Sequence, residues 1–166
     1  MIKAFSLQDG VLFAVLAAGA FWDIKSRRIP NWLMAAGAAV GAAAGGLRFI
    51  GLFAAVVIVF FPLYLCRMIG AGDIKVMALI VGFLGPFQGA DVLAVSFCIG
   101  AAVSLFKLLC RGILQQRLIY FMVYIRHLFQ TKQITAYFKP ERDGYDVTIP
   151  FVACLFFGTI ISWWWK

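Results

Sequence analysis

Two acidic residues, Asp23 and Asp73, stand where carboxylate chemistry is possible. Asp23 lies in "FWDIKSRRIPN", directly after an apolar stretch, and Asp73 lies in "GAGDIK", between two apolar stretches. Two carboxylates held close together share one proton, because both cannot ionise comfortably. One can then take a proton from water while the other polarises a peptide carbonyl. This chemistry hydrolyses a peptide bond without an acyl-enzyme and without a metal or cofactor.

Each aspartate also has a structural interpretation. Asp73 can cap the N-terminus of the helix that follows it by accepting backbone N–H bonds. Asp23 is expected at the C-terminus of a helix, where the macrodipole disfavours an anion. Basic residues just after it can offset that charge: Lys25, Arg27 or Arg28. An acid at a membrane edge is costly if it enters the bilayer, so its presence favours a functional role.

Turn-forming residues accompany both aspartates. Pro30 and Asn31 open the apolar stretch that follows Asp23, and Gly70 and Gly72 precede Asp73. The glycines permit unusual backbone angles and close approach beside an extended substrate. Their simpler interpretation is a tight loop between two helices.

The elements that must hold these residues are membrane helices. Of the 166 residues, 64% are hydrophobic and only 13% are charged, which excludes an ordinary soluble domain. The uncharged runs predict an all-α, polytopic membrane protein with six transmembrane helices in one membrane-embedded domain over 1–166. These runs are 10–22, 29–47, 49–66, 76–90, 92–106 and 147–165. The first run also resembles a cleavable secretory signal, but five later runs favour a retained helix.

Cysteine and histidine give no indication of a metal site. The four cysteines are scattered, with no C-x-x-C pair, and His127 is the only histidine. This pattern favours neither a zinc site nor a disulfide framework. We therefore expect no metal and no cofactor.

The basic residues predict the orientation of the chain. The net charge of +8 could suggest nucleic acid, but the positive-inside rule explains its distribution better. Alternate loops hold all but three of the fifteen Lys and Arg residues, the exceptions being Lys3, Arg48 and Lys166. We expect a protein of the cytoplasmic membrane with both termini extracytoplasmic, with Asp23 and Asp73 near the cytosolic face, and with no nucleic-acid partner.

A basic segment at about 108–146 is expected in the cytosol. Its sequence "RGILQQRLIYFMVYIRHLFQTKQ" mixes apolar and basic residues as an interfacial amphipathic helix does. Anchoring to lipid is the favoured interpretation, with substrate recognition as the alternative.

The two aspartate motifs together resemble those of a known family. "GAGDIK" at 70–75 is similar to the G-x-G-D-x-K signature of type IV prepilin peptidases, and "DIKSRRIPN" at 23–31 resembles their first aspartate motif. "VTIPFVACLFFG" at 147–158 is similar to the Ile-Pro-Phe opening of the family's last helix. The motifs stand in the family's order, and the six-span layout covers essentially the whole chain.

The resemblance implies an aspartyl intramembrane endopeptidase with Asp23 and Asp73 as its catalytic pair. Such enzymes remove the basic leader of prepilins or pseudopilins at the cytosolic membrane face, which serves type IV pilus assembly and secretion. Lys75 would support the second motif, either by positioning Asp73 or by meeting lipid phosphate. The paired cysteines and additional segment of the larger, methylating members are absent from this sequence. We therefore expect peptidase activity without N-methylation.

Two other classes of function use the same residues differently. In a small ion or proton-coupled transporter, Asp23 and Asp73 would bind cations or relay protons. The sequence shows no convincing internal repeat of the kind that transporters favour, and both acids map to the membrane edge. In a structural membrane component the aspartates would be caps only, which leaves the combined motifs unexplained.

Overall fold

The described residues form helices only, which confirms the all-α prediction. A computed structural model of the chain describes residues 7–27, 29–131 and 149–164. Its helices are α1 (Leu7–Ser26), α2 (Asn31–Leu65), α3 (Ala71–Leu84), α4 (Pro86–Cys110), α5 (Leu114–Thr131) and α7 (Phe151–Trp164).

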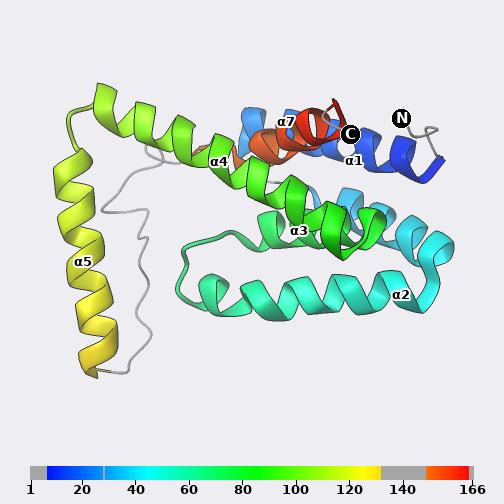
Figure 1. Ribbon diagram of the computed structural model, residues 1–166, viewed down its shortest axis with the longest axis horizontal. Coiled ribbons are helices and arrows are strands. Elements are labelled where there is room, and N and C mark those ends of the chain that lie inside the picture. Colours follow the sequence, from blue (N-terminus) through cyan, green and yellow to red (C-terminus); the bar gives the residue numbers. More distant parts are fainter. Residues whose placement is uncertain (1–6, 28, 132–148, 165–166) are drawn as a thin grey trace.

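Helix α2 covers most of two of the predicted runs, 29–47 and 49–66. A kink at Gly46 separates its two arms, with φ 56° and ψ −145°. Such angles are accessible to glycine and strained for residues with a side chain. Figure 1 shows the chain reversing direction at this point, so the second arm returns toward the end where α2 began.

The predicted run 76–90 is wrong at its end. Helix α3 stops at Leu84, Gly85 adopts φ 86°, and α4 begins with Pro86 in its first turn. A glycine at positive φ followed by a proline ends one helix and starts the next. The prediction used the charge of Asp91 as the boundary, although the Gly85–Pro86 pair is the physical one.

Helices α2 and α4 are long and apolar enough to cross a membrane, and α7 is a shorter apolar helix. Helix α3 has 14 residues and is about 21 Å long at 1.5 Å per residue, which is less than a bilayer core. The prediction of six spans therefore remains a prediction, as does the orientation of the chain.

Helix α3 forms the centre of the bundle. It packs against α1, α2, α4 and α7, and in Figure 1 it lies between the second arm of α2 and the helices α1 and α7. Its residues from Val76 to Ile80 are at most 1% exposed. Because neighbours surround α3 along this length, its first turn, which carries Asp73, has a fixed place relative to α1 and α7.

Helix α5 stands apart from this bundle. It contacts α4 and points away from the other helices (Figure 1). Among its apolar side chains, Ile119 is 64% exposed and Met122 is 73% exposed. The helix falls within the predicted segment 108–146, although 108–110 belong to α4 and 132–148 lie outside the described residues. Its exposed apolar surface supports the interfacial interpretation, which stays a prediction.

Candidate active site

Asp23 reaches from α1 to the N-terminus of α7. Its side chain is buried, and Oδ2 accepts a hydrogen bond of 2.9 Å from the backbone N–H of Val152. Val152 is the second residue of α7, whose first N–H groups have no acceptor within the helix. The positive end of this second helix favours an anion. The favourable N-terminus of α7 therefore offsets the unfavourable C-terminal dipole of α1 at the Asp23 carboxylate.

The backbone of Asp23 is also held. Helix α1 ends at Ser26, and Arg27 follows in the left-handed region with φ 53°. The N–H of Arg27 donates to the carbonyl oxygen of Asp23 over 2.9 Å. This bond closes the last turn of α1 in the αL manner. Main chain and side chain of Asp23 are thus both hydrogen-bonded.

Asp73 lies in the first turn of α3, directly beside Gly70. Gly70 is the N-cap residue, and its N–H donates to the Asp73 carboxylate, which is one half of a capping box. A Cβ atom placed on Gly70 would lie 3.1 Å from Asp73 Oδ2. The expected capping role is present, and it holds the carboxylate in place.

Gly70 and Gly72 matter because they lack a side chain, and not because they adopt unusual backbone angles. Gly70 has φ −73°, which any residue can adopt, and Gly72 is not among the described residues with positive φ. A Cβ on Gly72 would lie 3.0 Å from Ile29 Cδ1. The expectation of unusual backbone angles is therefore wrong. The atoms close to both glycines belong to the chain's own Asp73 and Ile29 side chains, and the expected close approach of a substrate stays a prediction.

The two motifs are joined by a side-chain hydrogen bond. Lys75 Nζ donates to Asn31 Oδ1 over 3.1 Å, so α3 is tied to the first residue of α2. Pro30 stands at the N-cap of α2 with φ −65°, and its carbonyl accepts from the N–H of Leu33. Lys75 thus contacts the first motif. This contact differs from both expected roles of Lys75, which were to position Asp73 or to meet lipid phosphate.

Burial raises the pKa of both carboxyls, and the charge of Asp23 adds to the rise at Asp73. Both acids lie beyond the ends of the predicted membrane-spanning runs. Asp23 directly follows the run 10–22, and Asp73 precedes the run 76–90. Burial, followed by the charge of Asp23, raises the pKa of Asp73 from 3.8 to about 7, against the opposing Gly70 N–H. Burial raises the pKa of Asp23, while the Val152 N–H and the Arg27 guanidinium oppose this rise. Asp23 therefore lies close enough to Asp73 to influence its ionisation.

The predicted site residues meet at one end of the bundle. This end contains the C-terminus of α1 and the N-termini of α2, α3 and α7, and it holds Asp23, Pro30, Asn31, Gly70, Gly72, Asp73 and Lys75. Sequence reasoning missed Val152, whose contribution is a backbone N–H and leaves no mark in the residue type. The neighbouring Ile149-Pro150-Phe151 was the available signal. Within the described part of the chain, no three His, Cys, Asp or Glu side chains gather into a possible metal site.

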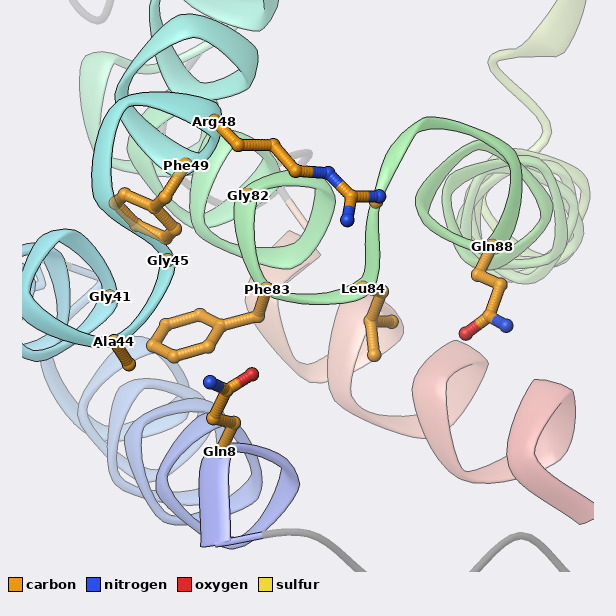
Figure 2. A pocket seen from close by; sticks show the side chains of 11 residues that line it. Gln8, Gly41, Ala44, Gly45, Arg48, Phe49, Gly82, Phe83, Leu84 and Gln88 are labelled. Atoms are coloured by element: carbon orange, nitrogen blue, oxygen red, sulfur yellow. The ribbon is translucent and has the colours of Figure 1, made fainter.

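A pocket of about 490 Å³ lies at the opposite end of α3 (Figure 2). Phe83 and Leu84 from the end of α3 line it, together with Arg48, Phe49 and Gln88. Ten residues of helix separate Phe83 from Asp73, which corresponds to about 15 Å at 1.5 Å per residue. This pocket contains neither aspartate, so carboxylate chemistry is not placed there.

Comparison with known proteins identifies one family. The model of the type IV leader peptidase family matches residues 10–105. This range includes both aspartates, the Pro30–Asn31 turn and the Gly70–Lys75 motif, and it covers more than half of the chain. No curated protein and no solved structure matches the chain.

Proposed function

The chain belongs to the type IV leader peptidase family, and from that premise we propose that Asp23 and Asp73 form its catalytic pair. The proposed reaction is endoproteolytic removal of the basic leader from a prepilin or pseudopilin at the cytosolic face of the cytoplasmic membrane. The observation that carries the proposal is the meeting of the two motifs at one end of the bundle, where Lys75 of the second motif donates to Asn31 of the first over 3.1 Å and Asp23 accepts the Val152 N–H over 2.9 Å.

The surroundings of the pair suit hydrolysis by two carboxyls. A carboxyl whose pKa is raised to about 7 keeps its proton under conditions where an ordinary aspartate has lost it. Asp23 receives an N–H bond and the charge of Arg27, both of which favour its ionised form. An acid and a base are then available side by side, as water-activating aspartyl chemistry requires.

The place of the pair suits a substrate that arrives from the membrane. Both acids lie at helix ends, next to turns, and not in the middle of the bundle. A leader that precedes an apolar helix presents its cleavage point at such an edge. We propose the cytosolic edge, because the basic loops flank this end in the sequence.

The test is leader removal in cells. The chain is co-expressed with a prepilin from the same genome, and the size of the prepilin is followed on a gel. Wild type is expected to cleave, while Asp23→Asn and Asp73→Asn are expected not to. Asp91→Asn is the matched control, because Asp91 is an exposed acid on α4 outside the helix ends that carry the pair. Each variant is checked for normal membrane level.

The outcomes separate the classes of function. Cleavage by wild type and the control, with loss in both site variants, supports the peptidase. Wild-type cleavage by either Asp23→Asn or Asp73→Asn would contradict the pair and return attention to ion or proton transport. The absence of N-methylation remains part of the proposal, and mass measurement of the mature pilin checks it through the absence of one added methyl group.

A further inference from the structure

We propose that the N-terminal turn of α7 holds Asp23 as the ionised base of the pair, so that Asp73 carries the shared proton and acts as the acid. This inference rests on the proposed function and adds a positioning role for the Val152 backbone. It also assigns the general base to Asp23 and the general acid to Asp73, which the motifs alone do not distinguish.

The first support is the hydrogen bond between α7 and Asp23. Val152 N–H lies 2.9 Å from Asp23 Oδ2, Val152 is fully buried and Asp23 is 8% exposed. A bond from an N–H to a carboxylate is stronger than one to a neutral acid, and shielding from water strengthens it further. The N-terminus of α7 adds its dipole in the same direction.

The second support is the difference in charge around the two acids. Arg27, just beyond α1, acts on Asp23, whereas Lys75, two residues after Asp73, donates to Asn31 on α2. The charge of Asp23 in turn acts on two titratable groups that face it, Asp73 from α3 and the Cys154 thiol from α7. Asp73 also accepts one N–H, from Gly70, and also lies at a helix N-terminus, that of α3, so the charge of Arg27 is what distinguishes the two acids. One negative charge shared by the pair is therefore more stable on Asp23.

This assignment gives a balanced reaction. The Asp23 carboxylate takes one proton from water as the water oxygen bonds to the peptide carbonyl carbon. Asp73 gives its proton to the carbonyl oxygen, and a tetrahedral diol forms. The C–N bond then breaks as the proton on Asp23 passes to the leaving nitrogen and a diol hydroxyl returns a proton to Asp73. Both carboxyls end as they began.

The test removes one N–H. Val152→Pro deletes the donor in the first turn of α7, where proline is best tolerated because that N–H has no acceptor in the helix. Ala153→Pro is the matched control, since it adds a proline one residue later and keeps the Val152 N–H. Both variants and wild type are purified in lipid vesicles, and the rate of prepilin cleavage is measured against pH.

The expected result is a shift of the acidic limb alone. Loss of the N–H makes Asp23 easier to protonate, so the acidic limb of Val152→Pro moves to higher pH by about one unit. Its alkaline limb, which reports the loss of the Asp73 proton, stays in place, and Ala153→Pro keeps both limbs of wild type. Movement of the alkaline limb would show that Asp23 is the acid, and two unmoved limbs would show that the bond is only structural.

A second measurement does not depend on the fold of the proline variant. Infrared spectra of wild type and Asp73→Asn are recorded in vesicles at pH 6. Their difference is expected to contain the C=O stretch of a protonated carboxyl. A difference that contains carboxylate stretches instead would overturn the assignment. Failure of the proposed function itself looks different, because wild type then cleaves no prepilin at any pH.

Discussion

The two ends of α3 use glycine in different ways. At the pocket end, Gly46 and Gly85 have positive φ and reverse the chain direction or end a helix. At the aspartate end, Gly70 has an ordinary φ and is needed because a Cβ would press on the Asp73 carboxylate. A glycine-rich turn is therefore not a sign of a site by itself. The aspartate end differs because its small residues allow polar groups from separate helices to meet.

Hydrogen bonding separates the same two ends. At the aspartate end, Val152 donates to Asp23, which joins the N-terminus of α7 to the C-terminus of α1. Lys75 donates to Asn31, which joins the N-terminal part of α3 to the N-terminus of α2. At the pocket end, Arg48 lies beside Gly85 and lines an open space with Phe49 and Phe83 (Figure 2). The first arrangement holds the proposed catalytic groups in place, and the second combines turns with a cavity.

The largest expected effect comes from the aspartates themselves. Asp23→Asn and Asp73→Asn should each lower the cleavage rate by about 10³-fold, because general acid and base catalysis both fail. The double variant should lose little more than either single variant, since the two groups act as one unit. Single-turnover cleavage in vesicles measures this. Multiplicative losses would mean that the two acids act independently.

Gly70→Ala should lower activity by about tenfold. The new Cβ lies 3.1 Å from Asp73 Oδ2, so the carboxylate must move by a few tenths of an ångström from its place. Gly51→Ala is the control, because a Cβ at Gly51 meets nothing within 4 Å. The rate per folded molecule is compared between the two. Equal rates would show that the Gly70–Asp73 contact has no part in catalysis.

Gly46→Ala should affect stability and leave activity intact. Its φ of 56° with ψ −145° is strained for alanine, while no atom lies within 4 Å of the added Cβ. We expect a loss of about 1–3 kcal/mol in the free energy of unfolding. Thermal unfolding in detergent measures the loss, and cleavage is assayed at low temperature. A fall in activity per folded molecule as large as that of Gly70→Ala would contradict the claim that the two ends use glycine differently.

Asp73→Asn should change the pH dependence of stability. The folded chain raises the pKa of Asp73 from 3.8 to about 7, so it binds this proton more tightly than the unfolded chain does. The stabilising contribution is complete below pH 3.8 and is lost as the pH rises through about 7. Asparagine does not ionise, so the Tm of the variant relative to wild type should be higher at pH 8 than at pH 5. A difference that is the same at both pH values would contradict the raised pKa.

Among the variants at the aspartate end, the smallest loss of activity is expected at the link between the two motifs. Lys75→Met removes the hydrogen bond to Asn31, which is exposed to solvent, so we expect a loss of activity of about threefold. Asn31→Ala should have the same effect, and the double variant should add nothing further. Independent losses would indicate that Lys75 acts on something other than Asn31.

The sequence predicted those features that depend on the type of a single residue or on the hydrophobicity of a stretch. Asp23 and Asp73 were recognisable as charges at the ends of apolar runs, and the runs themselves predicted helices. The break at Gly85–Pro86 was also visible, but charge was used as the boundary instead. The bond from Val152 to Asp23 joins residues 129 positions apart through a backbone group, so no residue type predicts it. The two motifs did predict that Asp23 and Asp73 form a pair, but the size of the influence of Asp23 on Asp73 depends on how α1 and α3 pack.

The most direct test of the central claim uses the purified chain alone. Wild type is reconstituted in lipid vesicles with a full-length prepilin, and mass spectrometry identifies the new N-terminus. The account predicts a single cut between the basic leader and the apolar helix, made by wild type and by neither Asp23→Asn nor Asp73→Asn. Cleavage at that site by either variant, or no cleavage by a folded wild type, would contradict it.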